Sequence, residues 1–392
     1  MKRIKLSELG EIVGGSTPST KDITNYDGEI SWITPKDLAN HNNIFIENGE
    51  RSITIKGFNS CSVKMLPKNS ILFTSRAPIG YIAIAKKELC TNQGFKSIIP
   101  NDKIYYLFLY YLLKYNKDYI ASFGSGTTFK EISGKVMKNI EIVIPDRLEI
   151  QKKIAYILFN IDKKIELNNQ INDNLHDLAE QLFFEIYKNG RERTLGDLLE
   201  NISTGARPKG GAQKSGIPSV GAEKIEKFGI YDYSSEKYIA EDFYEKLKNG
   251  KMNSEDVLLY KDGAYTGKVS MCLNWFPHKK SAVNEHVFIL NTENNWAQNY
   301  LYFTLYNKQN KEMLERLAGA KAAQPGLNQT ELKSLKINIC NKEFIKKFEN
   351  EVKPIMESIA NNSLENKKLV ELRDTLLPKL MNGEINLDKI EI

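Results

Sequence analysis

The sequence predicts an α+β protein in which two similar mixed α/β domains are separated by two long helices that pack as an antiparallel coiled coil. Three observations support this fold class. The same order of motifs occurs twice, offset by about 195 residues. A long amphipathic segment follows each copy. The 392-residue chain is 41% hydrophobic and 27% charged, which is typical of a soluble globular protein with two or three domains.

The closing part of each copy shows the repeat clearly. Residues 123–145 read FGSGTTFKEISGKVMKNIEIVIP, and residues 318–340 read AGAKAAQPGLNQTELKSLKINIC. Each begins with a loop of small residues, continues into a short helical pattern and ends in a strand with alternating apolar positions. We infer that one type of domain is present twice.

The earlier motifs also follow one order in both copies. Each copy has a short amphipathic turn, a Gly-containing loop closed by a proline, a strand, a hairpin-like pair of strands around a glycine, a further strand and a helix. The matching segments are LSELGEIVGGSTPS (6–19) and LGDLLENISTGARPK (195–209), EISWITPKDL (29–38) and GIPSVGAEKI (216–225), NSILFTSRAPIGYIAI (69–84) and EDVLLYKDGAYTGKVSM (255–271), TNQGFKSIIP (91–100) and VNEHVFILN (283–291), and YYLFLYYLLKY (105–115) and NYLYFTLYNK (299–308).

These motifs predict four consecutive parts of the chain. They are a first domain (1–146), a first long helix (147–190), a second domain (191–340), and a second long helix with a C-terminal tail (341–392). The apolar positions persist between the copies, whereas the polar residues of the turns differ. Two explanations remain open: one scaffold has loops that address different ligands, or loops diverge faster than cores.

The two segments between and after the domains predict long helices. Residues 150–187 have apolar side chains at steps of mostly three and four. About 38 residues at ~1.5 Å each give a rod of roughly 57 Å, which needs a partner to be stable in water. Residues 344–385 have the same register and would supply that partner. In this register, Phe348, Val352, Ile355, Ile359, Leu369, Leu372 and Leu376 fall opposite Ile154, Leu158, Ile161, Ile165, Leu175, Leu178 and Leu182.

Both predicted helices have polar centres, NNQIND (168–173) and NNSLEN (361–366). A polar seam within a coiled coil fixes the register at some cost in stability. Pro354 and Pro378 predict a kink or late start in the second helix and a break near its C-terminal end. Packed antiparallel, the helices would hold the two domains at opposite ends, related by a pseudo-two-fold axis. The alternative is two unrelated surface helices, each packed on its own domain.

The net charge of +6 is concentrated in the two predicted domains. Residues 1–146 have 19 Lys and Arg against 14 Asp and Glu, and residues 191–340 have 21 against 18. The helical segments 147–190 and 341–392 have 6 against 7 and 9 against 10. This distribution indicates two lobes that approach a polyanion, or else chance scatter in a Lys-rich protein.

The sequence gives little support for a secreted, membrane-spanning, zinc-binding or disulfide-bonded protein. The N-terminus lacks the apolar core of a signal peptide. The longest apolar run, IYYLFLYYLL (104–113), is too short to cross a bilayer and predicts a buried amphipathic helix. Without CxxC spacing, the scattered Cys61, Cys90, Cys272 and Cys340 support neither zinc binding nor disulfides. We therefore expect a cytoplasmic protein.

Motifs of catalysis are also missing from the sequence. It has no GxxxxGK[ST] string for an ATPase, and no Asn-Pro-Pro-aromatic loop for an amino-methyltransferase. His41, His176, His278 and His286 show no metal-ligand spacing, so we expect no metal site. For His286, in NEH, a ligand or base and a satisfied structural histidine are both open readings. We expect a protein that is not an enzyme.

The chain from Leu6 to Ile385 resembles the DNA specificity (S) subunit of Type I restriction-modification systems. LGEIVGGSTPS followed by ISWITPKDL looks like the opening of that family's target recognition domain, and GSGTTFKEISGKVMKNIEIVIP like the segment that closes it. RLEIQKKIAYIL resembles the start of the first spacer helix, and LRDTLLPKLMNGEI the end of the second. The second copy departs from the pattern, because it reads PSVGAEKI in place of the tryptophan-containing phrase, and NICNKEFIKKF at the start of its helix.

The resemblance implies a non-catalytic subunit that reads a bipartite, asymmetric site in double-stranded DNA, one half per domain, with an unread spacer between the halves. It also implies two methylation (M) subunits on the helices, restriction (R) subunits, and S-adenosylmethionine, ATP and Mg in those partners rather than in this chain. The helix residues that would bind partners are Ile161, Ile165, Leu175, Leu178, Leu182, Ile355, Ile359, Leu369, Leu372 and Leu376. A standalone two-domain DNA-binding protein and a coiled-coil scaffold that binds only proteins are the alternatives.

Polar residues in the loops are the candidates for contact with DNA, because Lys and Arg bind phosphates and polar side chains read base edges. The candidates are Thr17, Ser19, Lys21, Lys36, Arg76, Tyr81, Gln93 and Lys130 in the first domain, and Arg207, Lys209, Lys224, Lys261, Tyr265, Lys268, Glu285, Lys321 and Gln324 in the second. Arg76 lies in the turn SRAPIG, where it would read guanine or be a solvated turn residue. Tyr265 would stack or wedge, or be half-buried. The loop GSGTT (124–128) would bring backbone N–H groups close to phosphates.

Overall fold

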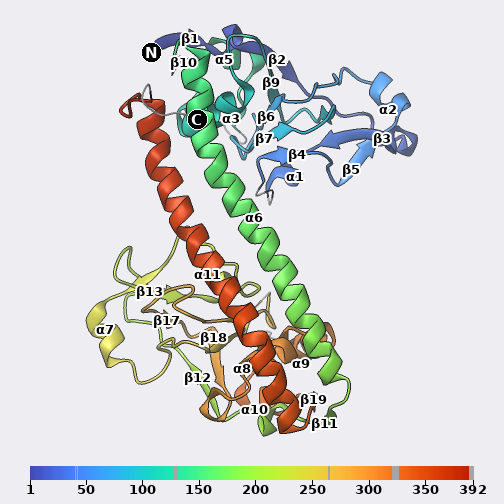
Figure 1. Cartoon of the computed structure of the whole chain (residues 1–392). Helices are drawn as coiled ribbons and strands as arrows, with labels where there is room; N and C mark the ends of the chain where they lie inside the picture. The colour runs from blue at the N-terminus through green and yellow to red at the C-terminus, as the bar shows by residue number, and fades with distance from the viewer. Residues whose placement is uncertain (40, 42, 127–129, 264, 320–325, 388–392) are drawn as a thin grey trace. The chain divides into compact units, whose positions relative to one another are not determined.

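The computed structural model describes residues 1–39, 41, 43–126, 130–263, 265–319 and 326–387 (Figure 1). The chain divides into two compact units. Unit 1 comprises Met1–Glu166 with Leu369–Ile392, and unit 2 comprises Leu167–Lys368. Each unit therefore contains one repeat copy and part of each long helix.

Unit 1 is built on three small sheets. A five-stranded sheet has the order β2-β9-β6-β7-β4, a three-stranded sheet the order β5-β3-β8, and β1 pairs with β10. The strands are β1 (Lys2–Lys5), β2 (Gly10–Gly14), β3 (Tyr26–Ile33), β4 (Phe45–Ile46), β5 (Arg51–Ile53), β6 (Ile71–Phe73), β7 (Ile82–Ala85), β8 (Cys90–Thr91), β9 (Lys96–Pro100) and β10 (Glu141–Ile144). The helices are η1 (Leu6–Glu8), η2 (Ile23–Asn25), α1 (Pro35–Ala39), α2 (Ile55–Asn59), α3 (Tyr106–Tyr115), α4 (Lys117–Ser122) and α5 (Gly134–Asn139).

Unit 2 repeats this plan. Its sheets have the orders β12-β18-β15-β16, β14-β13-β17 and β11-β19. The strands are β11 (Arg191–Thr194), β12 (Asn201–Thr204), β13 (Ile217–Val220), β14 (Tyr238–Ile239), β15 (Val257–Tyr260), β16 (Val269–Met271), β17 (Ala282–Val283), β18 (Val287–Asn291) and β19 (Lys336–Ile339). The helices are η3 (Leu195–Asp197), η4 (Ala222–Lys224), α7 (Glu241–Lys246), η5 (Glu293–Asn295), α8 (Gln298–Tyr306), α9 (Lys308–Gly319) and α10 (Gln329–Ser334).

The strand pairings confirm the internal repeat. The pair β3–β8 is parallel, with Ile33 opposite Thr91, and its counterpart β13–β17 is also parallel, with Val220 opposite Val283. The residues that lead into β6 and β15, Asn69 and Glu255, both have a φ of 71°. Strand β4 is an addition of unit 1, since the described part of unit 2 has no corresponding strand in its sheet order. The two copies therefore share one topology as well as one order of motifs.

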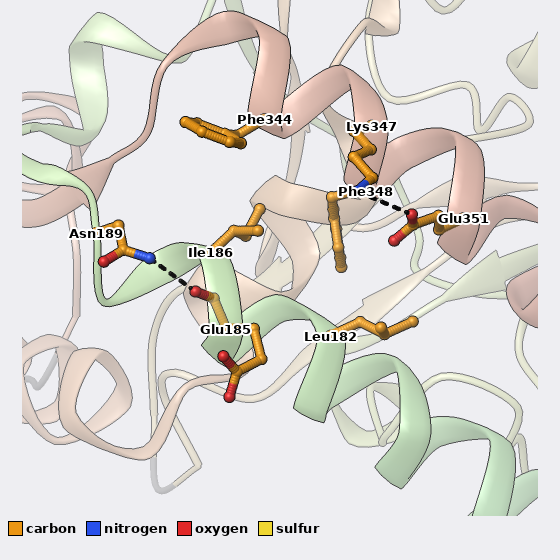
Figure 2. Close-up of a pocket in the computed structure, with 8 residues that line it drawn as sticks. All are labelled: Leu182, Glu185, Ile186, Asn189, Phe344, Lys347, Phe348 and Glu351. Atoms are coloured by element: carbon orange, nitrogen blue, oxygen red, sulfur yellow. Dashed lines mark hydrogen bonds and ion pairs between the residues drawn. The ribbon is translucent and has the colours of Figure 1, made fainter.

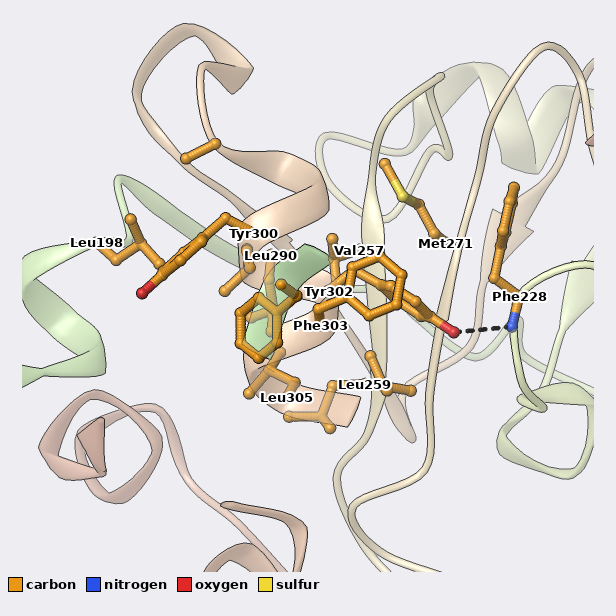
Figure 3. Packing of buried hydrophobic residues seen from close by; sticks show 14 of the residues in the cluster. Leu198, Phe228, Val257, Leu259, Met271, Leu290, Tyr300, Tyr302, Phe303 and Leu305 are labelled. Atoms are coloured by element: carbon orange, nitrogen blue, oxygen red, sulfur yellow. Dashed lines mark hydrogen bonds between the residues drawn. The ribbon is translucent and has the colours of Figure 1, made fainter. Parts of the chain in front are cut away.

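Buried aromatic helices hold the sheets of each unit in place. In α3 the seven residues 107–113 are all buried, so the longest apolar run is a core helix, as predicted. In unit 2, Tyr300, Tyr302 and Phe303 of α8 project among apolar side chains of the sheet, and the Tyr302 hydroxyl accepts a hydrogen bond from the backbone of Phe228 at 3.1 Å (Figure 3). Among the residues described, no helix combines the length and the apolar character that crossing a membrane requires.

The two long helices are α6 (Leu148–Tyr187) and α11 (Lys342–Met381). In unit 2 they run antiparallel, since Asn172 contacts Ser363 while the ring of Phe183, further along α6, lies 6.1 Å from the ring of Phe348. In unit 1, Asp162 and Arg373 form an ion pair at 2.7 Å. The predicted pairing of the two helices is confirmed in each unit, but the predicted opposition of Phe348 and Ile154 is wrong, because Phe348 lies against Phe183 in the antiparallel arrangement.

A seam of amide hydrogen bonds joins the polar centres of the helices in unit 2, as predicted. Asn168 donates to Glu365 at 2.7 Å and to Asn366 at 2.9 Å. Asn172 donates to Ser363 at 3.1 Å and accepts from Asn362 at 2.9 Å. Because each amide binds across the pair, these bonds hold the two helices in one register.

Two expectations about the helices are corrected. Helix α11 begins at Lys342 and continues through Pro354, so the late start is wrong. Its end is set by Gly383, with a φ of 73°, rather than by Pro378. The N–H groups of Gly383 and Glu384 bind the carbonyls of Leu380 and Lys379, which is the Schellman arrangement of a helix end.

The apolar stripe of α6 also differs from the sequence pattern. The stripe predicted through Leu175, Leu178 and Leu182 is half-buried or exposed in unit 2. The buried face consists instead of Asn168, Asn172, His176, Ala179, Phe183 and Tyr187. The side chains of Asn168, Asn172 and His176 each have a hydrogen-bond partner on α11 or α8, whereas Oδ1 of Asn168 has none among the residues described.

Candidate nucleic-acid interface

Four segments of unit 1 meet through backbone hydrogen bonds, and we call residues 14–18, 74–81, 91–96 and 130–132 the first loop group. Ser16 donates to Thr91 at 3.0 Å, Ser75 to Gly94 at 2.8 Å, and Ile132 to Ser75 at 2.9 Å. A side chain at Gly15 would place its Cβ 2.0 Å from the carbonyl oxygen of Asn92, so only glycine permits this close approach. Segments far apart in sequence thus form one surface.

The first loop group brings together five of the predicted DNA-contacting residues: Thr17, Arg76, Tyr81, Gln93 and Lys130. The Thr17 hydroxyl donates to the Gln93 side chain. Nε of Arg76 lies 2.9 Å from a carboxylate oxygen of Glu131, whose other oxygen lies 3.7 Å from Nζ of Lys96. Arg76 is therefore oriented by an acidic neighbour rather than only solvated.

The other three candidates of unit 1 lie at the edge of this group. Lys36 forms an ion pair with Glu50 at 2.7 Å, which raises the pKa of the lysine. Lys36 follows Pro35, against which Gly94 packs so closely that a Cβ there would lie 2.8 Å from the proline ring. Ser19 and Lys21 are exposed in the segment that follows Thr17.

An equivalent set of segments meets in unit 2, and we call residues 204–207, 260–268, 283–287 and 326–327 the second loop group, of which 264 is outside the described residues. Lys261 donates to His286 at 3.1 Å, and Leu327 donates to Lys261 at 2.7 Å. These bonds correspond to Ser75–Gly94 and Ile132–Ser75 of unit 1. A Cβ at Gly205 would lie 1.6 Å from the carbonyl oxygen of Val283, so this glycine corresponds to Gly15.

The side chains of the second loop group form a chain of charged contacts. Nδ1 of His286 lies 2.6 Å from Oδ1 of Asp262, and its Nε2 lies 3.6 Å from Glu285. Arg207 approaches Glu285 at 4.0 Å, and Lys261 approaches Asp262 at 3.7 Å. Three predicted residues, Arg207, Lys261 and Glu285, therefore come together around Asp262 and His286, which were not among the predicted DNA contacts.

Tyr265, Lys268 and Lys209 offer further contact groups. The Tyr265 side chain is 63% exposed, so it is not half-buried, and Nζ of Lys268 lies 4.9 Å from the centre of its ring. Lys268 also forms an ion pair with Glu226. Lys209 is exposed beside Gly210 and Gly211, both of which have positive φ. An aromatic ring with a cation beside it suits stacking on a base.

Lys224 is a correction among the predicted contacts. Its side chain is 8% exposed, and its ammonium donates to the carboxylate and carbonyl of Asp232 and to the carbonyl of Ser234. Hydrogen bonds from Ser234 and from Lys224 hold the pKa of Asp232 down to about 2. With its three donors engaged, Lys224 stabilises the loop after η4 and is not available to DNA. Lys321 and Gln324, and residues 127 and 128 of the loop 124–128, lie outside the described residues.

Sequence reasoning missed Asp262, Glu131 and Lys96, and it left the role of His286 open. The repeat alignment contained the signal, because SRAPIG and KDGAYTG place Arg76 and Asp262 at matching points of one turn.

A cluster of possible metal ligands lies on α6, where side-chain atoms of His176, Asp177 and Glu180 lie within 4.8 Å of one another. His176 has a hydrogen-bond partner in Tyr302 at 3.0 Å, and burial lowers its pKa to about 4, so the structure gives it a core role.

The predicted partner-binding residues of the helices differ in accessibility. Ile359 is fully buried, while Ile161, Ile165, Leu175, Leu182, Ile355, Leu369 and Leu376 are half-buried. Leu178 on α6 and Leu372 on α11 are 45% and 47% exposed. These two leucines occupy matching positions, because each is residue 31 of a 40-residue helix.

A pocket of about 480 Å³ lies between the end of α6 and the start of α11 in unit 2 (Figure 2). Its apolar lining consists of Leu182, Ile186, Phe344 and Phe348, and Phe344 is mostly exposed. The polar residues Glu185, Asn189, Lys347 and Glu351 complete the lining. The pocket thus combines an apolar floor with charged groups, on a helix surface that includes one predicted partner-binding residue.

Comparison with known proteins identifies the class. The family described as Type I restriction modification DNA specificity domain matches residues 1–177. The chain is 35% identical to the Type I restriction enzyme MjaIX specificity subunit of Methanocaldococcus jannaschii over 98% of this chain and 94% of that protein. It is 30% identical to the EcoR124I/EcoR124II specificity subunit of Escherichia coli over 43% of this chain. The crystal structure of a Type-I restriction-modification system S subunit from M. genitalium shares its fold, with a TM-score of 0.63 and 18% identity over 97% of this chain and 96% of that one.

The chain belongs to the family of Type I restriction enzyme specificity subunits. It is the DNA sequence-specificity component of a restriction-modification complex that also contains methylation and restriction subunits, and enzymatic activity lies in those subunits. The alternative of a standalone DNA-binding or scaffold protein is therefore not favoured.

Proposed function

We propose that the chain reads a bipartite, asymmetric site in double-stranded DNA, one half-site for each loop group. The observation that carries this proposal is the double occurrence of one hydrogen-bonded loop scaffold with different side chains at matching positions. Arg76, Gln93 and Thr17 of the first group correspond to Asp262, Glu285 and Arg207 of the second. Because base edges are distinguished by their donors and acceptors, two groups with different side chains read different sequences.

The proposed contacts divide into two kinds. Exposed lysines and arginines, including Lys21, Lys130 and Lys209, would neutralise phosphates, and the excess positive charge of both domains supports this role. Arg76, Gln93, Glu285 and Tyr265 would face base edges or stack on bases, since loop scaffolds hold them at the surface. Ser19, Lys36, Tyr81, Lys261 and Lys268 remain proposed contacts at the margins of the two groups.

The experiment is selection of bound duplexes from a randomised library by the chain in complex with its methylation subunits. We expect two specified blocks of different sequence, separated by a spacer of fixed length and free sequence. Affinity should fall steeply with salt, with a slope that reflects the phosphates contacted. One block alone, a symmetric pair, or affinity that does not change with salt would contradict the proposal.

We further propose that two methylation subunits dock on the helices, with restriction subunits joining that complex, and that S-adenosylmethionine, ATP and Mg act in those partners. The matching exposures of Leu178 and Leu372 support two equivalent docking points. The apolar pocket beside Leu182 offers additional contact area in unit 2. Native mass spectrometry of the assembled complex should give two methylation subunits per chain; a single one at saturating concentration would contradict this stoichiometry.

We place the protein in the cytoplasm. Its four cysteines are all free thiols, and three of them are buried. Burial raises the pKa of Cys90 to about 12, which keeps this thiol protonated and unreactive. Fractionation of cells that express a tagged chain would test the location, and recovery outside the cytoplasm would contradict it.

A further inference from the structure

The two loop groups place side chains of opposite charge at one equivalent backbone position. In unit 1, Gly80 donates to the carbonyl of Thr74 at 3.0 Å, and in unit 2 Gly267 donates to Tyr260 at 2.9 Å, so the same turn closes both loops. The residue two places after Thr74 is Arg76, and the residue two places after Tyr260 is Asp262. Each also forms an isolated β-bridge with the last segment of its loop group. Arg76 pairs with Glu131, and Asp262 pairs with Gly326. Arg76 and Asp262 are therefore structural counterparts.

Each of these side chains is flanked by opposite charge. Glu131 contacts the Nε edge of Arg76, so the guanidinium is oriented by that contact. Asp262 lies between Nδ1 of His286, at 2.6 Å, and Nζ of Lys261, at 3.7 Å. A bare carboxylate would be repelled by DNA phosphates, but one with an imidazole and an ammonium beside it is tolerated near a polyanion. The environment of Asp262 thus suits a carboxylate at a DNA surface.

His286 occupies the place that Gly94 has in the first loop group, because both accept the equivalent backbone hydrogen bond from Lys261 or Ser75. The histidine backbone is fixed further by a hydrogen bond from its N–H to the Asn284 side chain at 2.9 Å, as Gly94 is fixed by Asn92 at 2.8 Å. The scaffold is therefore identical at this point, and the imidazole is an addition of unit 2. Its contact with Oδ1 of Asp262 orients the carboxylate, and Oδ2, which lies 3.7 Å from Nζ of Lys261 and so beyond hydrogen-bond distance, keeps the capacity to accept from another donor.

A carboxylate can only accept hydrogen bonds, and this limits the bases that it can read. In the major groove, the exocyclic amino groups of cytosine and adenine are the donors on base edges. An arginine at the matching position donates and favours guanine. We propose that Asp262 is a specificity-determining residue of the second half-site, positioned by His286, and that it accepts a hydrogen bond from the exocyclic amino group of a cytosine or an adenine. This inference rests on the proposed function of the second loop group.

The test uses the chain in complex with its methylation subunits and a duplex library randomised in the second half-site. The variants are Asp262→Asn, Asp262→Ala, His286→Ala and His286→Gln. Asp242→Asn is the matched control, because it removes the same charge from an exposed residue of α7 in the same domain. We expect wild-type protein to prefer cytosine or adenine at one position, and Asp262→Asn to reduce that preference about tenfold. The other positions, the first half-site and the control should be unchanged.

A second measurement tests the contact itself. In the preferred duplex, the selected base is replaced by an analogue without its amino group, either 2-pyrimidinone for cytosine or purine for adenine. This replacement should weaken binding by wild-type protein about tenfold and binding by Asp262→Ala very little, because the partner is already missing. If His286 is a positioning residue, His286→Ala should lower the preference, and His286→Gln, which retains a side-chain donor, should restore part of it.

Three results would overturn the inference while the proposed function stands. They are an unchanged preference in Asp262→Asn and Asp262→Ala, an equal loss of affinity for all sequences, and a preference for guanine or thymine that persists at every specified position. If Asp262→Asn fails to fold in a thermal unfolding comparison, the analogue measurement on wild-type protein and the His286 variants decide the question. A wild-type complex that selects no two-part site would overturn the proposed function, and this inference with it.

Discussion

The two units of the molecule have the same strand orders, apart from the added β4 of unit 1, but join their long helices by different polar chemistry. In unit 1 a partly buried ion pair links Asp162 of α6 to Arg373 of α11, with side chains 11% and 16% exposed, and the hydroxyl of Tyr111 donates to the same carboxylate at 2.8 Å. In unit 2 the link is a seam of amides and hydroxyls centred on Asn168 and Asn172. The difference teaches that this fold accepts either chemistry where each of these polar side chains makes at least one bond across the helix pair.

The same contrast occurs where a long helix supports the start of a core helix. In unit 1 the neutral Gln151 accepts a hydrogen bond from the backbone of Tyr105 at 3.0 Å, just before α3. In unit 2, Glu349 accepts from the backbone of Tyr300 at 2.8 Å and from the side chain of Asn299 at 2.7 Å, at the start of α8. Burial raises the pKa of Glu349 to about 7. A neutral group and an acid thus do one structural task.

The largest expected effect breaks the ion pair of unit 1. Arg373→Ala leaves the partly buried Asp162 without its cation, so we expect unit 1 to lose about 3 kcal/mol of stability, the lower end for a broken buried pair. Hydrogen exchange measured by mass spectrometry should show the loss in α3 and in the paired helix segments of unit 1. The control is Lys64→Ala, which removes an exposed cation paired with Glu11 and should change stability by less than about 0.5 kcal/mol. A loss in Arg373→Ala no larger than in this control would show that the ion pair is dispensable.

The next effect concerns one exposed leucine in each unit, Leu372 in unit 1 and Leu178 in unit 2. Leu178→Glu and Leu372→Glu each place a charge at a matching exposed position, so each should weaken one methylation-subunit contact by about 2–4 kcal/mol. Native mass spectrometry should show one remaining methylation subunit for either single variant and none for the double variant at moderate concentration. Ile55→Glu, at another exposed apolar residue of unit 1, should retain both. Full assembly of the double variant would be incompatible with docking at these leucines.

A third effect distinguishes Gln151 of unit 1 from Glu349 of unit 2, because only the glutamate makes the stability of its unit depend on pH. The pKa of Glu349 is raised from 4.5 to about 7 by burial, so the folded protein binds this proton more tightly than the unfolded chain. Its stabilising contribution is complete below about pH 4.5 and is lost as the pH rises through about 7, by about 3 kcal/mol. Glu349→Gln should flatten this dependence in unit 2, measured by urea unfolding at several pH values. A variant with the same slope as wild type would assign the dependence to other groups.

The smallest effect sharpens the comparison of the loop groups. Arg76→Ala should weaken binding to the first half-site by about 1–3 kcal/mol and relax the preference at one position. The second half-site should be read as before, because its loop group does not include this residue. Competition binding with duplexes altered in either half-site measures both quantities. Unchanged affinity together with unchanged preference would remove Arg76 from the interface.

Much of the fold could be predicted from the sequence, because its signals are local and occur twice. The alternating strands, the glycines of the hairpins and the apolar helix periodicity depend on neighbouring residues, and each was found in both copies. The polar centres of the long helices were also visible, and they form the seam of unit 2. The apolar stripe was less reliable beyond Ile165, since a helix turns its face toward whatever packs on it, and in unit 2 that face includes Asn168 and His176.

The candidate interface shows the same division. The sequence by itself determined that two copies of a domain exist, that their loops differ, and that Arg76 and Arg207 lie in those loops. Only the tertiary structure decided that Lys224 is engaged in its own domain, that Glu131 orients Arg76, and that His286 meets Asp262. Such contacts join residues far apart in the chain, and their geometry depends on how the strands pair. A pattern in sequence records which residues can be buried, whereas the packed structure decides which polar groups meet.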